Sequence, residues 1–267
     1  MTLKRTIISL CLAGAPWVCA AQSISGITKP IHAVVLSGPM HGQIEQINVK
    51  EGDTVGVGQT LITLRHRVEA LETEKLELIW KDKSALKAAA NRKSTLAKLL
   101  ESSQALYAGG GSISKEALSK EQVEARQAEA DWQRLEVAEE KERLEYELAK
   151  EELDRRFIKS SIAGTVTRIR HDMGERYQIN EPLIELVDTS RGWFIANVDD
   201  ATGRRLRPAQ EVSLSFQAGD KQLQVKGRVV YLAPVLDAAS GLMEIKVEFA
   251  NPDNLIHLGS SGTLNVD

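Results

Sequence analysis

The chain has 267 residues, of which 42% are hydrophobic and 27% charged, and its formal net charge is −3. This balance argues against a nucleic-acid-binding protein, and the length allows only about two ordinary domains. Aromatic residues make up only 4%, while Ala, Leu, Glu and Lys are abundant, which predicts thin helical or β structure instead of one large core.

Residues 1–21 have the pattern of a secretory signal peptide. Two basic residues, Lys4 and Arg5, precede an apolar stretch, and a run of small residues follows it. This pattern predicts cleavage near Gln22. We therefore expect a protein of the periplasm that associates with the cell envelope.

Both cysteines of the chain, Cys11 and Cys19, lie in this segment, so the mature chain has no thiol for a disulfide, a metal or a nucleophile. Acylation of Cys19 is the alternative, but Pro16, Trp17 and Val18 are unfavourable before a lipidated cysteine. An uncleaved anchor is also disfavoured, because a bilayer span needs about 20 apolar residues and this stretch is shorter.

An internal repeat with a constant offset of 122 residues flanks the middle of the chain. Each copy has nearly alternating apolar residues and a turn in which an acid follows glycine, Gly52-Asp53 or Gly174-Glu175. The copies predict two halves of one small β-sandwich, residues 22–65 and 158–190. The matched pairs are Gly42 and Gly164, Ile44 and Val166, Ile47 and Ile169, Gly52 and Gly174, Val55 and Tyr177, Leu61 and Leu183, Ile62 and Ile184, and Leu64 and Leu186.

Residues 66–157, between the copies, contain no proline, and their only glycines are Gly109–Gly111. This predicts two antiparallel helices of about 42 residues, each roughly 60 Å long, that form a coiled-coil hairpin. The heptad is imperfect, because Lys93 falls on the apolar stripe. The stripe comprises Leu76, Ile79, Leu86, Ala90, Ala97, Leu100 and Tyr107 before the glycines, and Leu118, Ala125, Trp132, Leu135, Leu144, Leu148 and Leu153 after them.

Residues 191–267 consist of short alternating segments separated by turns, which predicts a compact β-barrel with a small helix near Asp199 to Leu206. The predicted fold class is therefore α+β: a split sandwich with an inserted helical hairpin, followed by a barrel. The predicted strands are Phe194 to Val198, Glu211 to Phe216, Leu223 to Tyr231 and Met243 to Phe249.

In this order of parts, the chain resembles the periplasmic adaptor, or membrane fusion protein, family of tripartite efflux and secretion pumps, with its HlyD-like and RND-efflux members. The family order is half a lipoyl domain, a helical hairpin, the other half, then a β-barrel. The residues that carry the resemblance are Gly52–Val55, Gly58–Leu61, Ile158, Gly164, Val166, Gly174, Pro182-Leu183, Leu206–Pro208, Gly227–Val229, Ala233–Val235, Asn251–Asp253 and Gly259.

The resemblance implies an adaptor that is not an enzyme and needs no cofactor. Its copies would form a homo-oligomeric ring, with the hairpin tips on an outer-membrane channel protein and the barrel side facing an inner-membrane transporter of RND or ABC type. The family's tip carries an Arg, a Leu and a Ser; Ser114 fits the serine, whereas Tyr107 and Ser103 stand at the other two positions. The predicted partner-binding residues are Gly109, Gly110, Gly111, Ser112, Ile113, Ser114 and Leu118.

Two departures from the family pattern are notable. Ser161 stands where relatives commonly have proline, which is a tolerable change at the entry of a strand. Many relatives also have a membrane-proximal domain built from both termini. We expect none here, so transporter docking would use the barrel or another subunit.

Several other functions are weighed against the adaptor hypothesis. Lipoyl or biotin carriers need a modified lysine in the turn that the hairpin replaces here. Met40-His41 and His171–Met173 could serve a metal-efflux adaptor with a weak site, but turn residues are the simpler interpretation, and we expect no metal. Gly109–Gly111 lack the Lys-Ser/Thr of a phosphate loop, and no serine has a nucleophile-elbow pattern.

Two alternatives remain open at this point. Arg204–Arg207 predicts a solvated helix end, or else a contact with an acidic transporter face or anionic lipid. The whole chain could also be a free-standing periplasmic coiled-coil scaffold that shares only the architecture.

Overall fold

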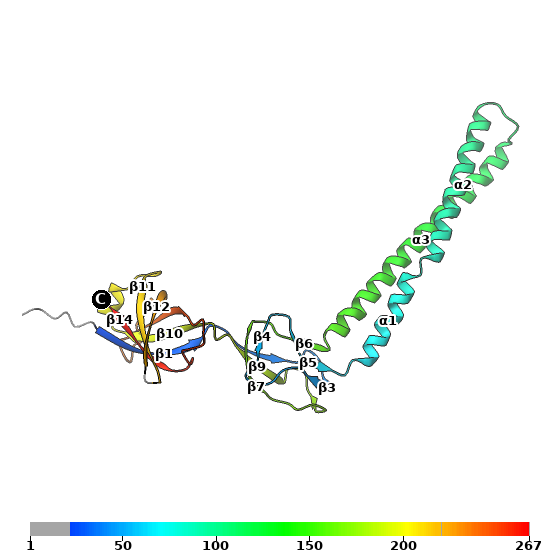
Figure 1. The fold of residues 1–267 in the computed structure, drawn as a ribbon. Coiled ribbons are helices and arrows are strands. Elements are labelled where there is room, and N and C mark those ends of the chain that lie inside the picture. Colours follow the sequence, from blue (N-terminus) through cyan, green and yellow to red (C-terminus); the bar gives the residue numbers. More distant parts are fainter. Residues whose placement is uncertain (1–21, 220, 267) are drawn as a thin grey trace, which may run out of the picture. The chain divides into compact units, whose positions relative to one another are not determined.

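The computed structural model describes residues 22–219 and 221–266 (Figure 1). The proposed signal peptide, residues 1–21, lies outside the described residues. Residues 34–186 form one compact unit, and the segments on either side of them form a second. Within the described ranges, no helix is both long and apolar enough to cross a membrane.

The second unit is a closed antiparallel barrel with the strand order β1-β10-β13-β12-β11-β14. A short helix, α4 (Asp200–Arg205), follows β10. The strands are β1 (Gln22–Pro30), β10 (Arg191–Val198), β11 (Glu211–Ala218), β12 (Lys221–Leu232), β13 (Met243–Ala250) and β14 (Ser261–Val266).

The predicted first sandwich half, residues 22–65, was wrong at its start. Residues 22–30 form strand β1, which closes the barrel between β10 and β14 instead. Ile24 and Thr28 are buried there. Gly26 lies between them, and a Cβ on it would come within 2.5 Å of the Phe194 ring. Alternating inward residues suit either β-domain, so local sequence could not assign this strand.

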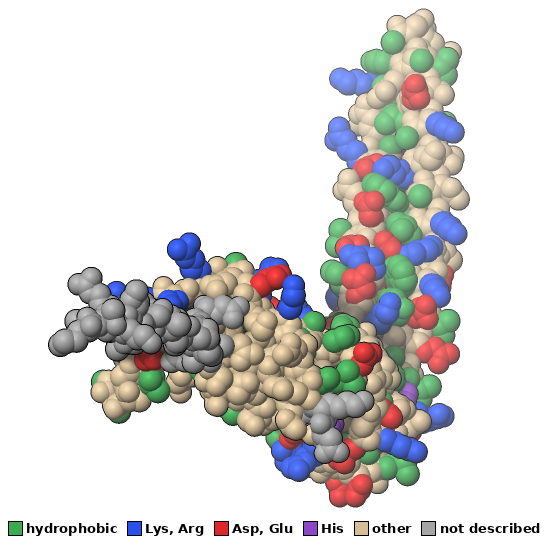
Figure 2. Space-filling view, turned by 60° about the vertical axis from the view of Figure 1, so that its left-hand side comes forward, with side chains coloured by type: hydrophobic (Ala, Val, Ile, Leu, Met, Phe, Trp, Pro, Cys, Tyr) green, Lys and Arg blue, Asp and Glu red, His purple; other side chains and the backbone are tan. Residues whose placement is uncertain are grey.

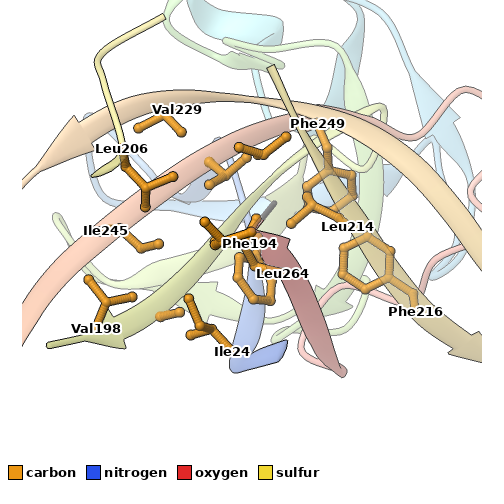
Figure 3. Packing of buried hydrophobic residues seen from close by; sticks show 14 of the residues in the cluster. Ile24, Phe194, Val198, Leu206, Leu214, Phe216, Val229, Ile245, Phe249 and Leu264 are labelled. Atoms are coloured by element: carbon orange, nitrogen blue, oxygen red, sulfur yellow. The ribbon is translucent and has the colours of Figure 1, made fainter. Parts of the chain in front are cut away.

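The barrel core is built around three phenylalanines (Figure 3). The Phe194 and Phe216 rings meet edge to face with centroids 6.2 Å apart, and the Phe216 and Phe249 centroids are 5.0 Å apart. Gly262 leaves room for Phe216, since a Cβ there would lie 2.4 Å from its ring. Small residues opposite large ones thus fill the narrow interior of the barrel.

The sandwich consists of two four-stranded sheets, β2-β9-β7-β4 and β6-β5-β3-β8. The two repeat copies exchange strands: β4 of the first copy pairs with β7 of the second, and β8 of the second pairs with β3 of the first. The strands are β2 (Ala33–Ser37), β3 (Gly42–Ile47), β4 (Thr54–Val55), β5 (Thr60–Leu64), β6 (Phe157–Lys159), β7 (Gly164–Ile169), β8 (Arg176–Tyr177) and β9 (Pro182–Val187).

The turns of the repeat mirror each other in detail. The Gly52 N–H donates to the Val166 carbonyl at 2.8 Å, and the Gly174 N–H donates to the Ile44 carbonyl at 2.9 Å. The glycines have φ of +93° and +90°, a conformation that residues with a Cβ rarely adopt. Each copy therefore completes the other's sheet. Repeat residues also supply most of the core, which includes Ile44, Val55, Leu61, Ile62, Leu64, Val166, Tyr177, Leu183, Ile184 and Leu186.

The helical insertion lies between β5 and β6 and comprises α1 (Arg67–Lys81), α2 (Ser84–Ala108) and α3 (Lys115–Asp154). Both α1 and α2 pack on α3. The first arm is thus broken, where one continuous helix was predicted. Asp82 has extended backbone angles, and its carboxylate accepts the N–H of Ser84. A side chain that bonds its own backbone in this way competes with the helix.

The seam between the arms differs in part from the predicted apolar stripe. Ile79, Tyr107, Leu144 and Leu148 are exposed. Small or polar residues are buried instead, because they allow the two backbones to approach closely. One consequence is a bond across the arms, in which the Thr73 hydroxyl donates to the Ala149 carbonyl at 3.2 Å. The buried seam residues are Thr73, Ser103, Leu118, Ala128 and Ala149.

Candidate partner-binding site at the hairpin tip

The tip is a tight reversal that follows directly from its three glycines. The N–H groups of Gly109 and Gly111 donate to the Ala105 and Leu106 carbonyls and so satisfy the end of α2. Gly110 has φ +74°. At Gly111 a Cβ would come within 2.9 Å of the Leu106 carbonyl oxygen. Gly110 and Gly111 are therefore required by the turn itself, whatever contact they also make.

Ser114 begins α3 as its N-cap. Its backbone is extended, and its hydroxyl oxygen accepts the N–H of Ala117 at 3.1 Å. The oxygen thus satisfies a helix-end donor that would otherwise lack a partner. The hydroxyl hydrogen remains available for a donor bond to another molecule. Ser114 consequently has a structural role that its position in the sequence motif did not reveal.

The predicted tip residues divide into exposed and inward-facing groups. Ser112 and Ser114 are exposed and Ile113 is half-buried. Leu118 is buried in the seam, so it holds the two arms together beneath the tip. Ser103, at the family's arginine position, is also buried, whereas Tyr107 is 45% exposed. The surface next to the turn thus comes mainly from residues 112–114 and the first turns of α3.

A shallow groove on the outer face of α3 adjoins this turn. Its walls include Lys120 and Val123, which the sequence analysis did not single out. Val123 is 63% exposed and lies off the heptad positions of the seam. Val123 could have been identified from the sequence, because it is an apolar residue outside the heptad pattern. On the face shown in Figure 2, the very end of the hairpin has few charged side chains, while acids and bases are interspersed below it.

Polar and aromatic contacts along the arms hold the tip in place. The Lys93 ammonium lies 3.4 Å from the centroid of the Trp132 ring and 3.0 Å from a Glu129 carboxylate oxygen. This explains how a lysine is accommodated on the stripe: its charge has two partners.

A second set of contacts braces the break between α1 and α2. The Trp80 and Tyr146 rings stack with centroids 5.3 Å apart. The Trp80 indole N–H and Lys83 both donate to Glu139. The bond from Lys83, together with the indole bond, holds the pKa of Glu139 below its usual value. The interruption is therefore tied to α3 from both sides.

An ion pair closes the base of the hairpin, and a backbone bond there joins the two chain segments that enter and leave it. Arg156 Nη2 lies 2.6 Å from Glu69 Oε1, which joins the end of α3 to the start of α1. The Leu64 N–H donates to the Arg156 carbonyl at 2.9 Å, so the last strand before the insertion and the chain leaving it are bonded together. Helix α3 spans 40 residues, or roughly 60 Å, between this base and the tip.

The other residues that the sequence suggested as sites do not come together in the described structure. Among the described residues, no group of three or more His, Cys, Asp or Glu side chains is arranged to hold a metal ion. His171 contacts Glu175 and Glu181, while Met173 is 70% exposed. In the basic run of α4, Arg204 pairs with Asp200 and Leu206 is buried in the barrel.

Family models cover both units. One described as YknX, barrel-sandwich hybrid domain, matches residues 34–187, which is more than half of the chain. One described as CusB-like, beta-barrel domain, matches residues 192–267. The chain therefore belongs to the periplasmic adaptor, or membrane fusion protein, family.

Individual relatives are distant in sequence. The chain is 23% identical to the uncharacterized protein YdhJ of Escherichia coli (strain K12) over 80% of this chain and 71% of YdhJ. MacA from Actinobacillus actinomycetemcomitans matches with a TM-score of 0.64 and 16% identity over 92% of this chain and 78% of MacA. The membrane fusion protein Spr0693 from Streptococcus pneumoniae R6 matches with a TM-score of 0.56 and 15% identity over 92% and 99% of the two chains. At such identities the likeness concerns the fold.

Proposed function

We propose that this protein is the periplasmic adaptor of a tripartite export pump, which bridges an inner-membrane transporter of RND or ABC type and an outer-membrane channel. Copies of the chain form a ring, and the barrel side docks on the transporter. The surface at residues 109–114, with Lys120 and Val123, meets the channel. Leu118 supports that surface from beneath. The function is mechanical coupling and makes or breaks no bond.

The observation that carries this proposal is the placement of the tip. It lies roughly 60 Å along α3 from the sandwich and cannot stabilise that core. Exposed Val123 and half-buried Ile113 flank a serine whose hydroxyl can still donate. The uncharged residues 109–114, with the apolar side chains of Ile113 and Val123, suit docking against another helical surface.

A matched pair of variants tests the contact. Val123→Asp places a charge at the proposed contact, and Val137→Asp places the same charge on the same helix at a position that is also exposed, at 71% against 63%. We expect Val123→Asp to abolish export in a drug-sensitivity assay with normal protein level and helicity, and Val137→Asp to keep it. Equal activity of the two variants would remove the tip from the mechanism and favour a scaffold without a channel partner.

Ser114 needs variants that separate its two roles. Ser114→Asp keeps an acceptor for the Ala117 N–H but adds charge and removes the donor, whereas Ser114→Ala removes the cap. If the serine serves the partner, export falls in Ser114→Asp while the melting temperature holds. If it serves only as a cap, Ser114→Asp exports normally. Photocrosslinking from position 113 in cells, followed by mass spectrometry, then shows whether the neighbour is an outer-membrane channel.

A further inference from the structure

A pocket of about 560 Å³ lies where the hairpin joins the sandwich, far along α3 from the tip. Its walls come from four places in the sequence: residues 41–43 at β3, residues 65–71 from the end of β5 into α1, Arg156 before β6, and residues 176–178 at β8. All of these belong to the same compact unit. The volume lies in the range of small-molecule sites. The proposed pump function assigns nothing to this pocket.

Four arginines line the pocket: Arg65, Arg67, Arg156 and Arg176. Backbone pairing brings two of them to the same strand, since the Arg65 N–H donates to the Gln43 carbonyl at 2.9 Å and Arg176 is the register partner of Gln43. Glu69, the one acid of the lining, pairs with Arg156. Over residues 22–219 and 221–266, no carboxylate lies within ion-pair distance of Arg65, Arg67 or Arg176. The pocket therefore has an excess of positive charge.

The start of α1 forms part of the same wall. Its first three residues, Arg67, Val68 and Glu69, all line the pocket. The N-cap residue His66 makes no side-chain capping bond, because its ring nitrogen faces the Leu64 carbonyl and Glu45 instead. The first backbone N–H groups of a helix have no acceptor within the helix, and they favour anions.

Two further features bear on what the pocket could bind. The buried Nε–H of Arg156 has no acceptor among the described residues, which is rare for a buried donor. At the rim, Val68 is 75% exposed and Leu71 is 53% exposed. A ligand that fits both features has an acidic head and an apolar body.

We propose that this pocket binds a small organic anion that carries one phosphate or carboxylate group. Arg65 and Arg176 hold the anionic head together with the first turn of α1, since guanidinium groups match the oxygens of such a head in pairs. Val68 and Leu71 cover the apolar body. The proposal does not depend on the pump function, because every residue that carries it lies in the sandwich or at the hairpin base.

Calorimetric titration of the purified chain with phenyl phosphate tests the proposal. Inorganic phosphate and phenol are the control ligands, and they represent the anionic head and the apolar body separately. We expect saturable binding of phenyl phosphate that weakens as salt is raised, with weaker binding of either part alone. Arg65→Gln and Arg176→Gln should each weaken it about tenfold, the lower end of the range for one bond to a charged group. Arg168→Gln, an exposed arginine of β7 outside the pocket, should change it less than twofold.

A variant that is expected to strengthen binding makes the test sharper. Glu69→Gln removes the acid of the pocket and releases Arg156, so it should tighten phenyl phosphate binding, with circular dichroism as the check on folding. No saturable binding at millimolar concentration, or equal weakening by Arg168→Gln, would overturn the proposal. Arginine-dependent sedimentation with phosphatidylglycerol vesicles, without phenyl phosphate binding, would also overturn it and assign the arginines to a lipid surface.

Discussion

The sandwich and the hairpin belong to one compact unit but are stabilised in different ways. In the sandwich, Leu61, Ile62, Leu183 and Ile184 are fully buried, and apolar contacts fill the core. In the hairpin, the seam buries small or polar residues such as Thr73 and Ala128, and charged pairs lie along its edges.

This difference shows where each region obtains its stability. Apolar burial is concentrated in a few sandwich side chains, so the loss of one is costly. The hairpin distributes its stability over many weak contacts along its length. Most of its surface can therefore change without unfolding it, which suits an element whose end serves another molecule.

The largest effect is expected from cavity formation in the sandwich. Leu61→Ala and its repeat mate Leu183→Ala should each lower the free energy of unfolding by about 2–5 kcal/mol. Leu78→Ala on the hairpin, at a site 66% exposed, should change it by less than about 0.5 kcal/mol. Urea titration measures all three. Similar losses at positions 61 and 78 would contradict the contrast drawn here.

A smaller effect is expected at the centre of the hairpin seam. Ala128→Asn puts an amide at a site only 1% exposed, which should cost about 1–3 kcal/mol. The loss should be local, so hydrogen exchange should speed up in α2 and α3 but not in the sandwich. Ala130→Asn, two residues along and exposed, controls for helix propensity. Uniformly faster exchange would mean that the two regions unfold together.

The Lys93 contacts should contribute less again. Lys93→Gln loses the interaction with the Trp132 ring, worth about 0.5–1 kcal/mol. Lys98→Gln removes the same charge at an exposed site on the same helix. Comparing the two melting temperatures separates the contacts of Lys93 with the Trp132 ring and Glu129 from the loss of one positive charge. If they fall equally, these contacts add nothing beyond net charge.

The smallest effect at neutral pH is expected for Tyr177→Phe. The Tyr177 hydroxyl is buried without a hydrogen-bond partner among the described residues, so its removal should be neutral or slightly stabilising. Burial raises the pKa of Tyr177, which means that the folded state favours the neutral phenol. Wild-type stability should therefore fall relative to Tyr177→Phe once the pH rises above about 10, where the unfolded phenol ionises. Parallel stability curves up to pH 11 would contradict this.

The sequence by itself determined the local elements of this protein. The repeat, the glycine reversal at Gly109–Gly111 and most barrel strands follow from periodicity and turn residues, which depend on neighbours along the chain. The sandwich core was also predictable, since Ile44 and Val166, like Leu61 and Leu183, are matched and buried.

Only the tertiary structure decided which elements pair. Strand β1 pairs in the barrel, and β4 and β8 each pair with a strand of the other repeat copy. The seam of the hairpin buries Thr73 and Ala128, whereas Ile79 and Leu144 are exposed. The arginine pocket also arose from segments far apart in the chain. Each of these depends on which distant surface an element meets, and an alternating or helical pattern is compatible with several such surfaces.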